Sequence, residues 1–333
     1  MRDGLLLDVE HLTVAFPVAG RQLRAVDDVS LSLAPGRCLC VVGESGCGKS
    51  AMARSLLRLH TNAEVGGRIL FRETPDASPV DVASVDPRSA AMRRIRGAGM
   101  AMVFQEPMAS LTPVYSVGRQ IVEAILAHED VTRSAAWERS VECLRLVGIP
   151  DPERRAADFP HQMSGGMRQR VVIAMALACR PALLIADEPT TALDVTVQSQ
   201  VLRLMKSIQA ELGMAILLVT HDLSVVAAVA DEVVVMYLGQ IVERAPAREF
   251  FAGPRHPYAQ GLLASVVPPN SSAKSALPFI SGQVPNALAS VTGCPFAPRC
   301  PQVHERCVTR PPMTKVGGVH EVACWLVEAE AAN

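Results

Sequence analysis

Residues 38–50 read CLCVVGESGCGKS. The unbroken apolar run 38–42 is followed by GESGCGKS from Gly43 to Ser50, and a helix-like stretch continues to about residue 60. The string fits the pattern G-x-x-x-x-G-K-[ST], and a strand, a loop and a helix in this order are the context that the pattern requires. The sequence therefore predicts a phosphate-binding loop between a buried strand and a helix.

The residue types in this loop suit a nucleotide. Glycines let the backbone turn tightly enough for successive N–H groups, with the N-terminus of the following helix, to surround phosphate oxygens. Lys49 is expected to neutralise the β and γ phosphates and Ser50 to bind Mg²⁺ through its hydroxyl. An ordinary glycine-rich turn is the alternative, which the flanking pattern disfavours. The expected nucleotide contacts are Gly43, Ser45, Gly46, Cys47, Gly48, Lys49 and Ser50.

A second apolar run, residues 182–186, ends in Asp187 and Glu188 and is stopped by Pro189. A strand buried on both faces, with its acidic end at a nucleotide, has this pattern. Adjacent strand residues point to opposite sides, so the two acids are expected to have different tasks. We assign Asp187 to the Mg²⁺ shell and Glu188 to general-base work on the attacking water. Two solvated acids are the alternative, which Pro189 and the upstream loop argue against.

With SGGMRQR from Ser164, these strings resemble the nucleotide-binding subunit of an ATP-binding cassette (ABC) transporter, over nearly the whole chain. The resemblance implies an α/β fold with a P-loop NTPase core of RecA type, an N-terminal antiparallel β-subdomain and a helical subdomain. It also implies that two such domains enclose two ATP molecules. Each ATP then lies between the phosphate loop of one domain and the signature loop of the other.

The signature loop is carried over from the family residue by residue. Ser164, Gly165 and Gly166 match its serine and glycines, which in the family bind the γ phosphate of the ATP held by the opposite subunit. Met163 stands where leucine is usual. This is an apolar exchange that we expect to be tolerated.

Four further residues match shorter motifs of the family. Gln105, in VFQEP, matches the glutamine that senses Mg²⁺ and the γ phosphate at the joint with the helical subdomain. Asp194, in TALD, matches the D-loop aspartate. His221 matches the switch histidine on the γ phosphate, and its role depends on the resemblance, because a lone histidine after a strand is usually structural. Phe16 stands where the family has an adenine-stacking aromatic, and equally fits a core residue near a strand end.

Composition limits the class of protein. A chain of 333 residues, 49% hydrophobic and 20% charged, is long enough for one large domain and a small one. A net charge of −1 gives no electrostatic footprint for nucleic acid. The longest apolar run, 171–179, is far short of the roughly 20 residues that span a bilayer. Acids in the first ten residues argue against an export signal, so we expect a soluble, cytoplasmic chain.

Two regions follow from the pattern beyond the phosphate loop. Residues 1–255 are expected to form the nucleotide-binding domain, with a helical subdomain at about 106–162 where apolar residues recur at helical spacing. QEPMASLTPVYSVGRQI resembles the segment with which peptide-type importers meet their membrane subunits, although self-contained packing is an open alternative. HPYAQGLLASVVP, from His256, resembles the start of the C-terminal extension of dipeptide and oligopeptide importers, which suggests a second domain at 256–333.

The cysteines fall into two groups. Five read as small buried hydrophobic residues: Cys38, Cys40, Cys47, Cys143 and Cys179. Four lie in a proline-rich tail that has little apolar material for a core: Cys294, Cys300, Cys307 and Cys324. A segment of that size usually needs a staple, and disulfides are disfavoured in a reducing cytoplasm. Four thiolates on one metal centre are therefore the simplest expectation.

The spacing C-x5-C-x6-C-x16-C matches neither paired zinc knuckles nor common ferredoxin runs, so the residues alone leave zinc and iron open. The resemblance implies a 4Fe-4S cluster on these four cysteines, with a structural role. Arg299 and Arg306 flank the cysteines, where they could offset the charge of the cluster. His304 and His320 are candidate substitute ligands.

The resemblance implies the ATP-hydrolysing motor subunit of a di- or oligopeptide importer, with ATP and Mg²⁺ as ligands. The implied partners are two transmembrane permease subunits, a second and different ABC ATPase subunit, and indirectly an extracytoplasmic solute-binding protein. The implied location is the cytoplasmic face of the membrane. Nickel or glutathione is the alternative cargo. Two other functions are alternatives. A soluble ABC ATPase usually has two cassettes or a long coiled-coil insertion, and this sequence has neither. An ATP-dependent iron–sulfur regulatory protein is distinguished by a lack of association with membranes.

Overall fold

The computed structural model describes residues 1–2, 4–106, 110–191, 193–266, 280–283, 285 and 292–327. Contacts within the chain divide it into two compact units, each built from several chain segments. The first contains residues 1–8, 32–37 and 70–218, and the second contains residues 9–31, 38–69 and 219–333. Each unit contains strands and helices, as expected for an α/β chain.

The first unit contains part of a parallel sheet and most of the long helices. β7 (Leu183–Asp187) is buried along its whole length and pairs in parallel with β6 (Met100–Val103). A strand covered on both faces reads as a continuous apolar run, which is why 182–186 predicts one. Its other elements are β5 (Val80–Asp81), α2 (Ala90–Ile95), α4 (Val117–Leu126), α5 (Arg133–Leu146), α6 (Pro152–Arg155), η1 (Pro160–Gln162), α7 (Gly165–Leu177), α8 (Val195–Leu212) and most of β8 (Ala215–Thr220).

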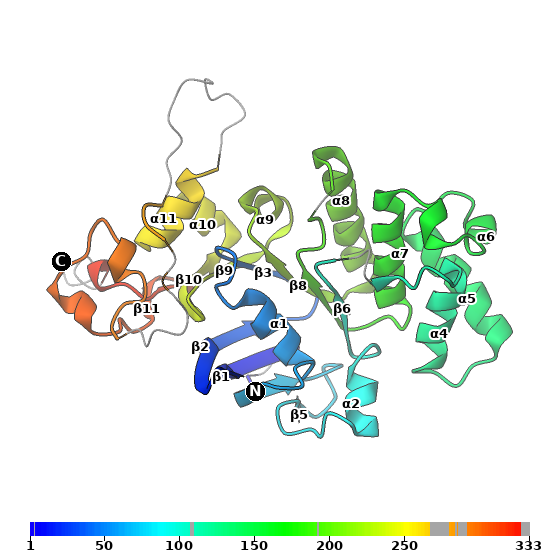
Figure 1. Ribbon diagram of the computed structural model, residues 1–333, viewed down its shortest axis with the longest axis horizontal. Coiled ribbons are helices and arrows are strands. Elements are labelled where there is room, and N and C mark those ends of the chain that lie inside the picture. The colour runs from blue at the N-terminus through cyan, green and yellow to red at the C-terminus, as the bar shows by residue number, and fades with distance from the viewer. Residues whose placement is uncertain are drawn as a thin grey trace. The chain divides into compact units, whose positions relative to one another are not determined.

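Helices α4, α5 and α7 form one packed group within this unit (Figure 1). Each begins at a hydroxyl residue, Ser116, Thr132 or Ser164, whose side chain accepts a backbone N–H of the first turn. Such caps satisfy donors that have no partner within the helix. The segment 106–162 contains α4, α5, α6 and η1, and α7 packs against α4 and α5 from beyond it. Residues 107–109 of this segment lie outside the described residues.

The second unit carries the phosphate loop. β3 (Cys38–Val42) is fully buried and pairs in parallel with β9 (Glu232–Tyr237). At its start, the N–H of Cys38 donates to the carboxylate of Asp231 at 2.7 Å. The other elements are β1 (Leu7–Val18), β2 (Arg21–Leu33), α1 (Lys49–Leu56), β4 (Glu64–Phe71), α9 (Leu223–Val229), β10 (Gln240–Pro246), α10 (Ala247–Ala252), α11 (Pro257–Ala264), η2 (Ala297–Arg299), η3 (Glu305–Val308), β11 (Thr314–Gly317) and β12 (His320–Val322).

The N-terminal strands β1 and β2 are joined by a two-residue connection. Ala19 has φ 47° and Gly20 has φ 76°. Positive φ at both central residues is the geometry of the tight turn whose twist matches that of two antiparallel strands. This hairpin provides antiparallel strands near the N-terminus, the kind of sheet that the resemblance implies there. Strand β4 continues the same sheet beside β1.

The C-terminal residues extend the sheet of the second unit. β10 pairs antiparallel with β9 and with β12, and β12 pairs antiparallel with β11. Glu243 faces Val322 in this register. A small apolar cluster of Val322, Cys324 and Val327 lies just after the last strand. The C-terminal strands thus continue this sheet in the order β11, β12, β10, and Figure 1 labels β10 and β11 in this region.

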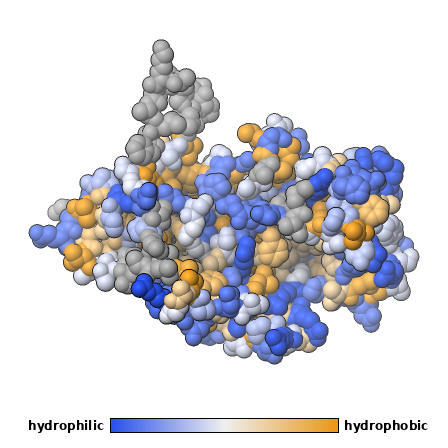
Figure 2. Space-filling model, in the orientation of Figure 1, coloured by the Kyte–Doolittle hydropathy of each residue, from blue (hydrophilic) through white to orange (hydrophobic). Residues whose placement is uncertain are grey.

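Most of the surface in Figure 2 is hydrophilic, and the hydrophobic residues on it occur in small patches. In the parts of the chain that the structure describes, we find no helix with both the length and the apolar character needed to cross a membrane.

Candidate functional site

The phosphate loop has glycines where side chains would collide. Gly43 has φ 152°, and a Cβ there would lie 2.2 Å from the carbonyl oxygen of Met236. Gly48 has φ 99°, and its Cβ would lie 2.1 Å from the carbonyl oxygen of Ala25. Gly46 has φ 81° but nothing within 4 Å of its Cβ position. Two glycines thus permit close backbone packing, and the third leaves the crest of the loop open.

Lys49 begins α1, and its ammonium group lies within the loop. Its Nζ donates to the carbonyl oxygens of Gly43 at 2.7 Å and Glu44 at 2.9 Å, and the residue is only 4% exposed. Cys47 is buried, and burial raises the pKa of its thiol. Only its backbone can therefore face a ligand. Ser45 is exposed and Ser50 half-buried, so both hydroxyl groups lie at or near the surface.

Phe16, on β1, is half-buried. Its ring meets the ring of His60 edge to face, with centroids 5.0 Å apart. A ring nitrogen of His60 lies 3.0 Å from the carbonyl oxygen of Ala51 in the first turn of α1. The ring of Phe16 is therefore anchored to the helix that follows the phosphate loop, while part of it stays accessible.

His221 follows β8 and is exposed. The next residue, Asp222, caps α9 by accepting the N–H of Ser224 at 2.8 Å, and its own N–H donates to Thr220 Oγ1 at 3.0 Å. These bonds fix the backbone on one side of His221 and leave its imidazole at the surface.

The acidic end of β7 lies in the first unit. Asp187 is fully buried, and Glu188 is 8% exposed with φ 49°. The Glu188 carboxylate accepts hydrogen bonds from Gln105 Nε2 and from Thr191 Oγ1, both at 3.0 Å on the same oxygen. The structure therefore brings together Gln105 and Glu188, which are 83 residues apart in sequence.

The signature loop lies at the start of α7. Ser164 caps the helix by accepting the N–H of Met167, and Gly165 is exposed with nothing within 4 Å of its Cβ position. A Cβ on Gly166 would lie 2.8 Å from Cγ1 of Val197, in the first turn of α8. Asp194 caps α8 and is exposed. The first turns of α7 and α8 thus meet, with Ser164 and Asp194 at the surface.

The expected site residues divide between the two units. The first unit contains Gln105, Ser164, Gly165, Gly166, Asp187, Glu188 and Asp194, and the second contains Phe16, Gly43, Ser45, Gly46, Cys47, Gly48, Lys49, Ser50 and His221. The hydroxyl, amide and carboxylate oxygens of Ser50, Gln105 and Asp187 are of the kind that Mg²⁺ prefers.

Two contacts of the phosphate loop are not predicted by the sequence. Arg299, which the sequence places beside the cysteines, forms an ion pair with Glu44, the second residue of the loop. Tyr258, from the HPY string, accepts a hydrogen bond from the backbone N–H of Glu44 at 2.8 Å. The HPY string and the cysteines both point to a C-terminal extension, but neither predicts a contact with the phosphate loop.

The four C-terminal cysteines influence one another electrostatically. Burial raises the pKa of Cys294 to about 11, and Cys307 and Cys324 add to the rise. Burial also raises the pKa of Cys300 and Cys324, and Cys307 adds to both. The N–H of Cys294 donates to the carbonyl oxygen of Cys307 at 3.0 Å.

These neighbouring thiols are not arranged as a ready-made metal site. Over the described residues, which include all four of these cysteines, no group of three or more His, Cys, Asp or Glu side chains is placed to hold a metal ion. The expected 4Fe-4S cluster therefore has no support from this geometry. His320, a candidate substitute ligand, instead lies with Nε2 2.8 Å from the carboxylate of buried Glu243.

Comparison with known proteins gives consistent matches. The ABC transporter family model matches residues 26–191, and the model of the oligopeptide/dipeptide transporter C-terminal region matches residues 242–307. A probable peptide ABC transporter ATP-binding protein of Sinorhizobium fredii is 47% identical, over 97% of this chain and 96% of its own length. The dipeptide transport ATP-binding protein DppD of Haemophilus influenzae is 46% identical, over 98% of this chain and 97% of its own.

Solved structures match about three quarters of the chain. The dimeric post-hydrolysis state of the ATP-binding cassette MJ0796, bound to ADP and Pi, is similar with a TM-score of 0.63 at 25% identity. The match covers 73% of this chain and 99% of that one. The structure of cbiO1 from Clostridium perfringens, described as part of the ABC transporter complex cbiONQ, is similar with a TM-score of 0.62 at 27% identity. The match covers 75% of this chain and 92% of that one.

Proposed function

The chain belongs to the family of ABC transporter ATP-binding proteins, and we propose that it is the ATP-hydrolysing subunit of an importer of di- or oligopeptides. The observation that carries the proposal is the combination of a phosphate loop with the C-terminal region of oligopeptide and dipeptide transporters on one chain. Relatives that match it almost end to end carry peptide or dipeptide transport in their names. The cassette supplies ATPase activity, and the C-terminal region favours peptides over nickel or glutathione.

We assign nucleotide binding to the phosphate loop. Its backbone N–H groups and the N-terminus of α1 face the phosphates, and Lys49 exchanges its two carbonyl partners for β and γ phosphate oxygens. Ser50, Gln105 and Asp187 would hold Mg²⁺, which offsets phosphate charge when bound. Phe16, half-buried beside α1, stacks on adenine.

Hydrolysis needs a positioned water more than covalent chemistry. Glu188 accepts the proton of that water as general base, and the amide of Gln105 orients its carboxylate. His221, exposed after β8, contacts the γ phosphate. Glu188, after β7, and His221, after β8, thus have separate tasks in the proposed mechanism.

The signature loop completes the site of a second ATPase subunit. Ser164, Gly165 and Asp194 are exposed at the meeting point of α7 and α8, which suits a surface that closes on another protein. ATP then lies between the phosphate loop of one subunit and the signature loop of the other. We propose that the partner is a different ATPase subunit, so that the motor is a heterodimer.

The remaining partners are membrane proteins. We propose that residues 1–255 form the nucleotide-binding domain and that its helical part, at about 106–162, transmits closure to two transmembrane permease subunits. The chain is then a peripheral subunit on the cytoplasmic face of the membrane. An extracytoplasmic solute-binding protein is an indirect partner, because it delivers the solute to the permease subunits. Residues 256–333 form the C-terminal extension of this branch.

We further propose that Cys294, Cys300, Cys307 and Cys324 bind a 4Fe-4S cluster. Support comes from the number of thiols, their position in a short proline-rich tail, and the 3.0 Å hydrogen bond from the N–H of Cys294 to the carbonyl oxygen of Cys307. Four cysteine thiolates are the usual ligands of such a cluster. Its role would be structural, as a staple for a segment with a small apolar core.

Reconstitution tests the transport function. The chain would be co-expressed with candidate permease and partner ATPase subunits, and the complex placed in liposomes with ATP inside or outside. We expect ATP-dependent uptake of a labelled dipeptide or oligopeptide, and no uptake with Glu188→Gln. Uptake of nickel or glutathione in place of peptide would contradict the proposal that the transported solute is a peptide. ATPase activity with no membrane partner at all would favour a soluble ABC ATPase.

A further inference from the structure

The guanidinium group of Arg299 lies against the phosphate loop. Its Nη1 and Nη2 donate to the two carboxylate oxygens of Glu44 at 2.6 and 3.1 Å, a bidentate ion pair. The side chain of Arg299 is 4% exposed, and that of Glu44 is 28% exposed. Bidentate pairs of this kind fix geometry as well as contributing energy. Glu44 directly follows Gly43 and is therefore part of the loop itself.

All five N–H donors of Arg299 are used. Besides Glu44, Nη1 donates to the hydroxyl of Tyr237 at 3.4 Å, Nη2 to the carbonyl oxygen of Ile280 at 3.3 Å, and Nε to that of Ser281 at 3.1 Å. The bond with Glu44 raises the pKa of Arg299, so the group stays charged. A fully satisfied, buried guanidinium has little freedom to move. It therefore holds the carboxylate of Glu44 in one place.

Tyr258 restrains the backbone of the same residue. The N–H of Glu44 donates to the Tyr258 hydroxyl at 2.8 Å. Burial raises the pKa of Tyr258, so its hydroxyl remains protonated. The ring packs against Tyr237 and Phe296, with centroids 4.7 and 5.3 Å away. Because this aromatic cluster fixes the ring, the hydroxyl is a rigid partner for the N–H of Glu44.

The restraint reaches the nucleotide-binding lysine. The carbonyl oxygen of Glu44 accepts from Lys49 Nζ at 2.9 Å. Glu44 is thus held at its side chain by Arg299 and at its N–H by Tyr258, while its carbonyl holds Lys49. We propose that Arg299 and Tyr258, both from the C-terminal extension, are positioning residues that fix the phosphate loop and Lys49 in the conformation that binds nucleotide. The proposal rests on the ATPase function of the chain and goes beyond it, because it gives the extension a task at the ATP site.

The test measures MgADP binding to the full chain by calorimetry, together with kcat and KM for ATP. Arg299→Met is expected to weaken MgADP binding at least about tenfold, which corresponds to about 1.4 kcal/mol. KM for ATP should rise with it. Tyr258→Phe keeps the ring and removes only the hydroxyl, so it should weaken binding in the same direction without loss of fold. Arg299→Lys should recover part of the affinity.

Arg306→Met is the matched control. Arg306 directly precedes Cys307 just as Arg299 directly precedes Cys300, but its guanidinium lies 4.2 Å from the centroid of the Trp325 ring. Any effect on the cysteine segment is therefore shared by the two variants, whereas an effect through Glu44 belongs to Arg299 alone. MgADP affinity of Arg306→Met is expected to equal that of the wild type.

A double-mutant cycle with Glu44 separates positioning from general stability. If Arg299 acts through Glu44, Glu44→Gln combined with Arg299→Met should be no weaker in MgADP binding than the weaker single variant. Wild-type affinity in both Arg299→Met and Tyr258→Phe, or strictly additive losses in the cycle, would overturn the proposal. A wild-type chain that does not bind MgADP would instead contradict the ATPase function itself.

Discussion

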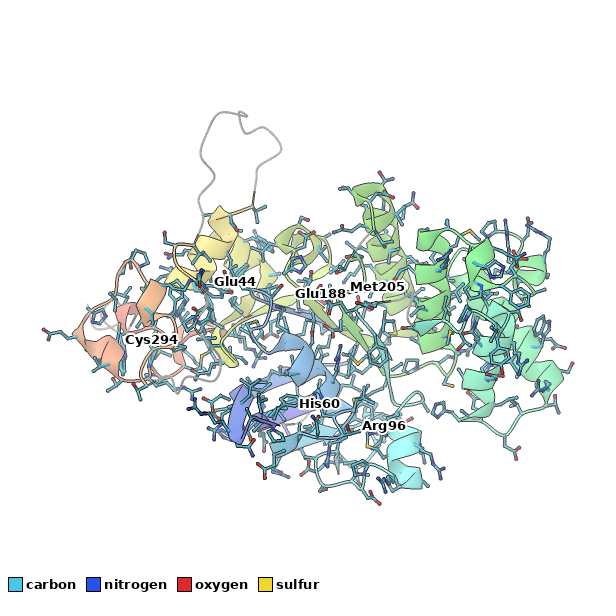
Figure 3. The ribbon with its side chains drawn as sticks, viewed as in Figure 1. Glu44, His60, Arg96, Glu188, Met205 and Cys294 are labelled. Carbon is cyan, nitrogen blue, oxygen red and sulfur yellow. The ribbon has the colours of Figure 1, made fainter. Side chains whose placement is uncertain are left out.

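The amide of Gln105 donates a 3.0 Å hydrogen bond to the carboxylate of Glu188, and the Thr191 hydroxyl donates to the same oxygen at 3.0 Å. Glu188 has φ 49°, in the left-handed region that is uncommon for residues other than glycine. Such backbone strain gathers at functional sites, where the surrounding structure holds it. Glu188, labelled in Figure 3, directly follows the last residue of β7, Asp187. The carboxylate is therefore fixed by two donors and by its own backbone.

Glu188→Gln should stop turnover while leaving nucleotide binding intact. The amide cannot accept a proton from water, and loss of a general base typically costs about 100-fold or more in kcat. Steady-state phosphate release and MgADP calorimetry measure the two properties. Glu153→Gln, a change at an exposed acid that pairs with Arg145, is the control and should behave as the wild type. Turnover near the wild-type rate in Glu188→Gln would remove Glu188 from the base role.

Gly166→Ala should destabilise the chain where Gly165→Ala does not. The new Cβ would lie 2.8 Å from Cγ1 of Val197, a β-branched side chain with little freedom to turn aside. Crowding of this kind costs about 1–3 kcal/mol. Gly165 has nothing within 4 Å of its Cβ position. Thermal unfolding of both variants measures the difference. Adding Val197→Ala to Gly166→Ala should restore stability, and equal melting temperatures for the two single variants would refute the crowding argument.

The stability of the chain should fall on acidification because of His256. Burial lowers the pKa of this histidine from 6.5 to about 3, and its Nδ1 accepts the N–H of Tyr258 at 3.0 Å. Below pH 6.5 the unfolded chain binds a proton that the folded chain excludes, so stability is lost between pH 6.5 and about 3. The slope from one such group approaches about 1.4 kcal/mol per pH unit.

Denaturant unfolding at pH 5, 6 and 7 measures this slope. His256→Asn keeps a side-chain acceptor at the start of α11 and has no proton to gain. The variant should lose part of the decline between pH 7 and pH 5. An identical decline in the wild type and in His256→Asn would place the acid sensitivity at other groups.

Protein purified without oxygen should contain iron and acid-labile sulfide, about four of each per chain. Cys294→Ser should remove both, because it deletes one of the four thiols in the C-terminal segment. Cys179→Ser is the control, because Cys179 lies at the end of α7, outside that segment, and the variant should keep the metal. Zinc, or no metal in the wild type, would reject the cluster and leave the ATPase function untouched.

The sequence predicted well those elements whose own residues decide their structure. The apolar run 38–42 is strand β3, and the apolar run 182–186 lies in strand β7 from Leu183 onward; both strands are buried along their whole length. The apolar run 171–179 lies largely in helix α7, which spans Gly165–Leu177 and is capped by Ser164. Gly43 and Gly48 are required by close backbone approach, which the G-x-x-x-x-G-K-[ST] pattern encodes directly.

Contacts between distant segments could not be predicted in the same way. Arg299 and Glu44 are 255 residues apart, and neither has a local pattern that points to the other. The sequence therefore assigns Arg299 to the neighbouring cysteines, whereas in the structure its guanidinium group pairs with Glu44. The sequence alone leaves open whether Phe16 is a core residue or stacks on adenine. In the structure its half-buried ring contacts the ring of His60, a tertiary contact that the strand pattern does not contain.

The pairing of β12 with β10 has a consequence for how the chain is made. Strand β10 pairs on one side with β9 and on the other with β12, through residues 321 and 322. During synthesis the edge that faces β12 stays unpaired until those two residues have left the ribosome. An open strand edge is a template for pairing with another chain. Premature stop mutations upstream of His320 should therefore yield an aggregating product rather than a shorter working enzyme.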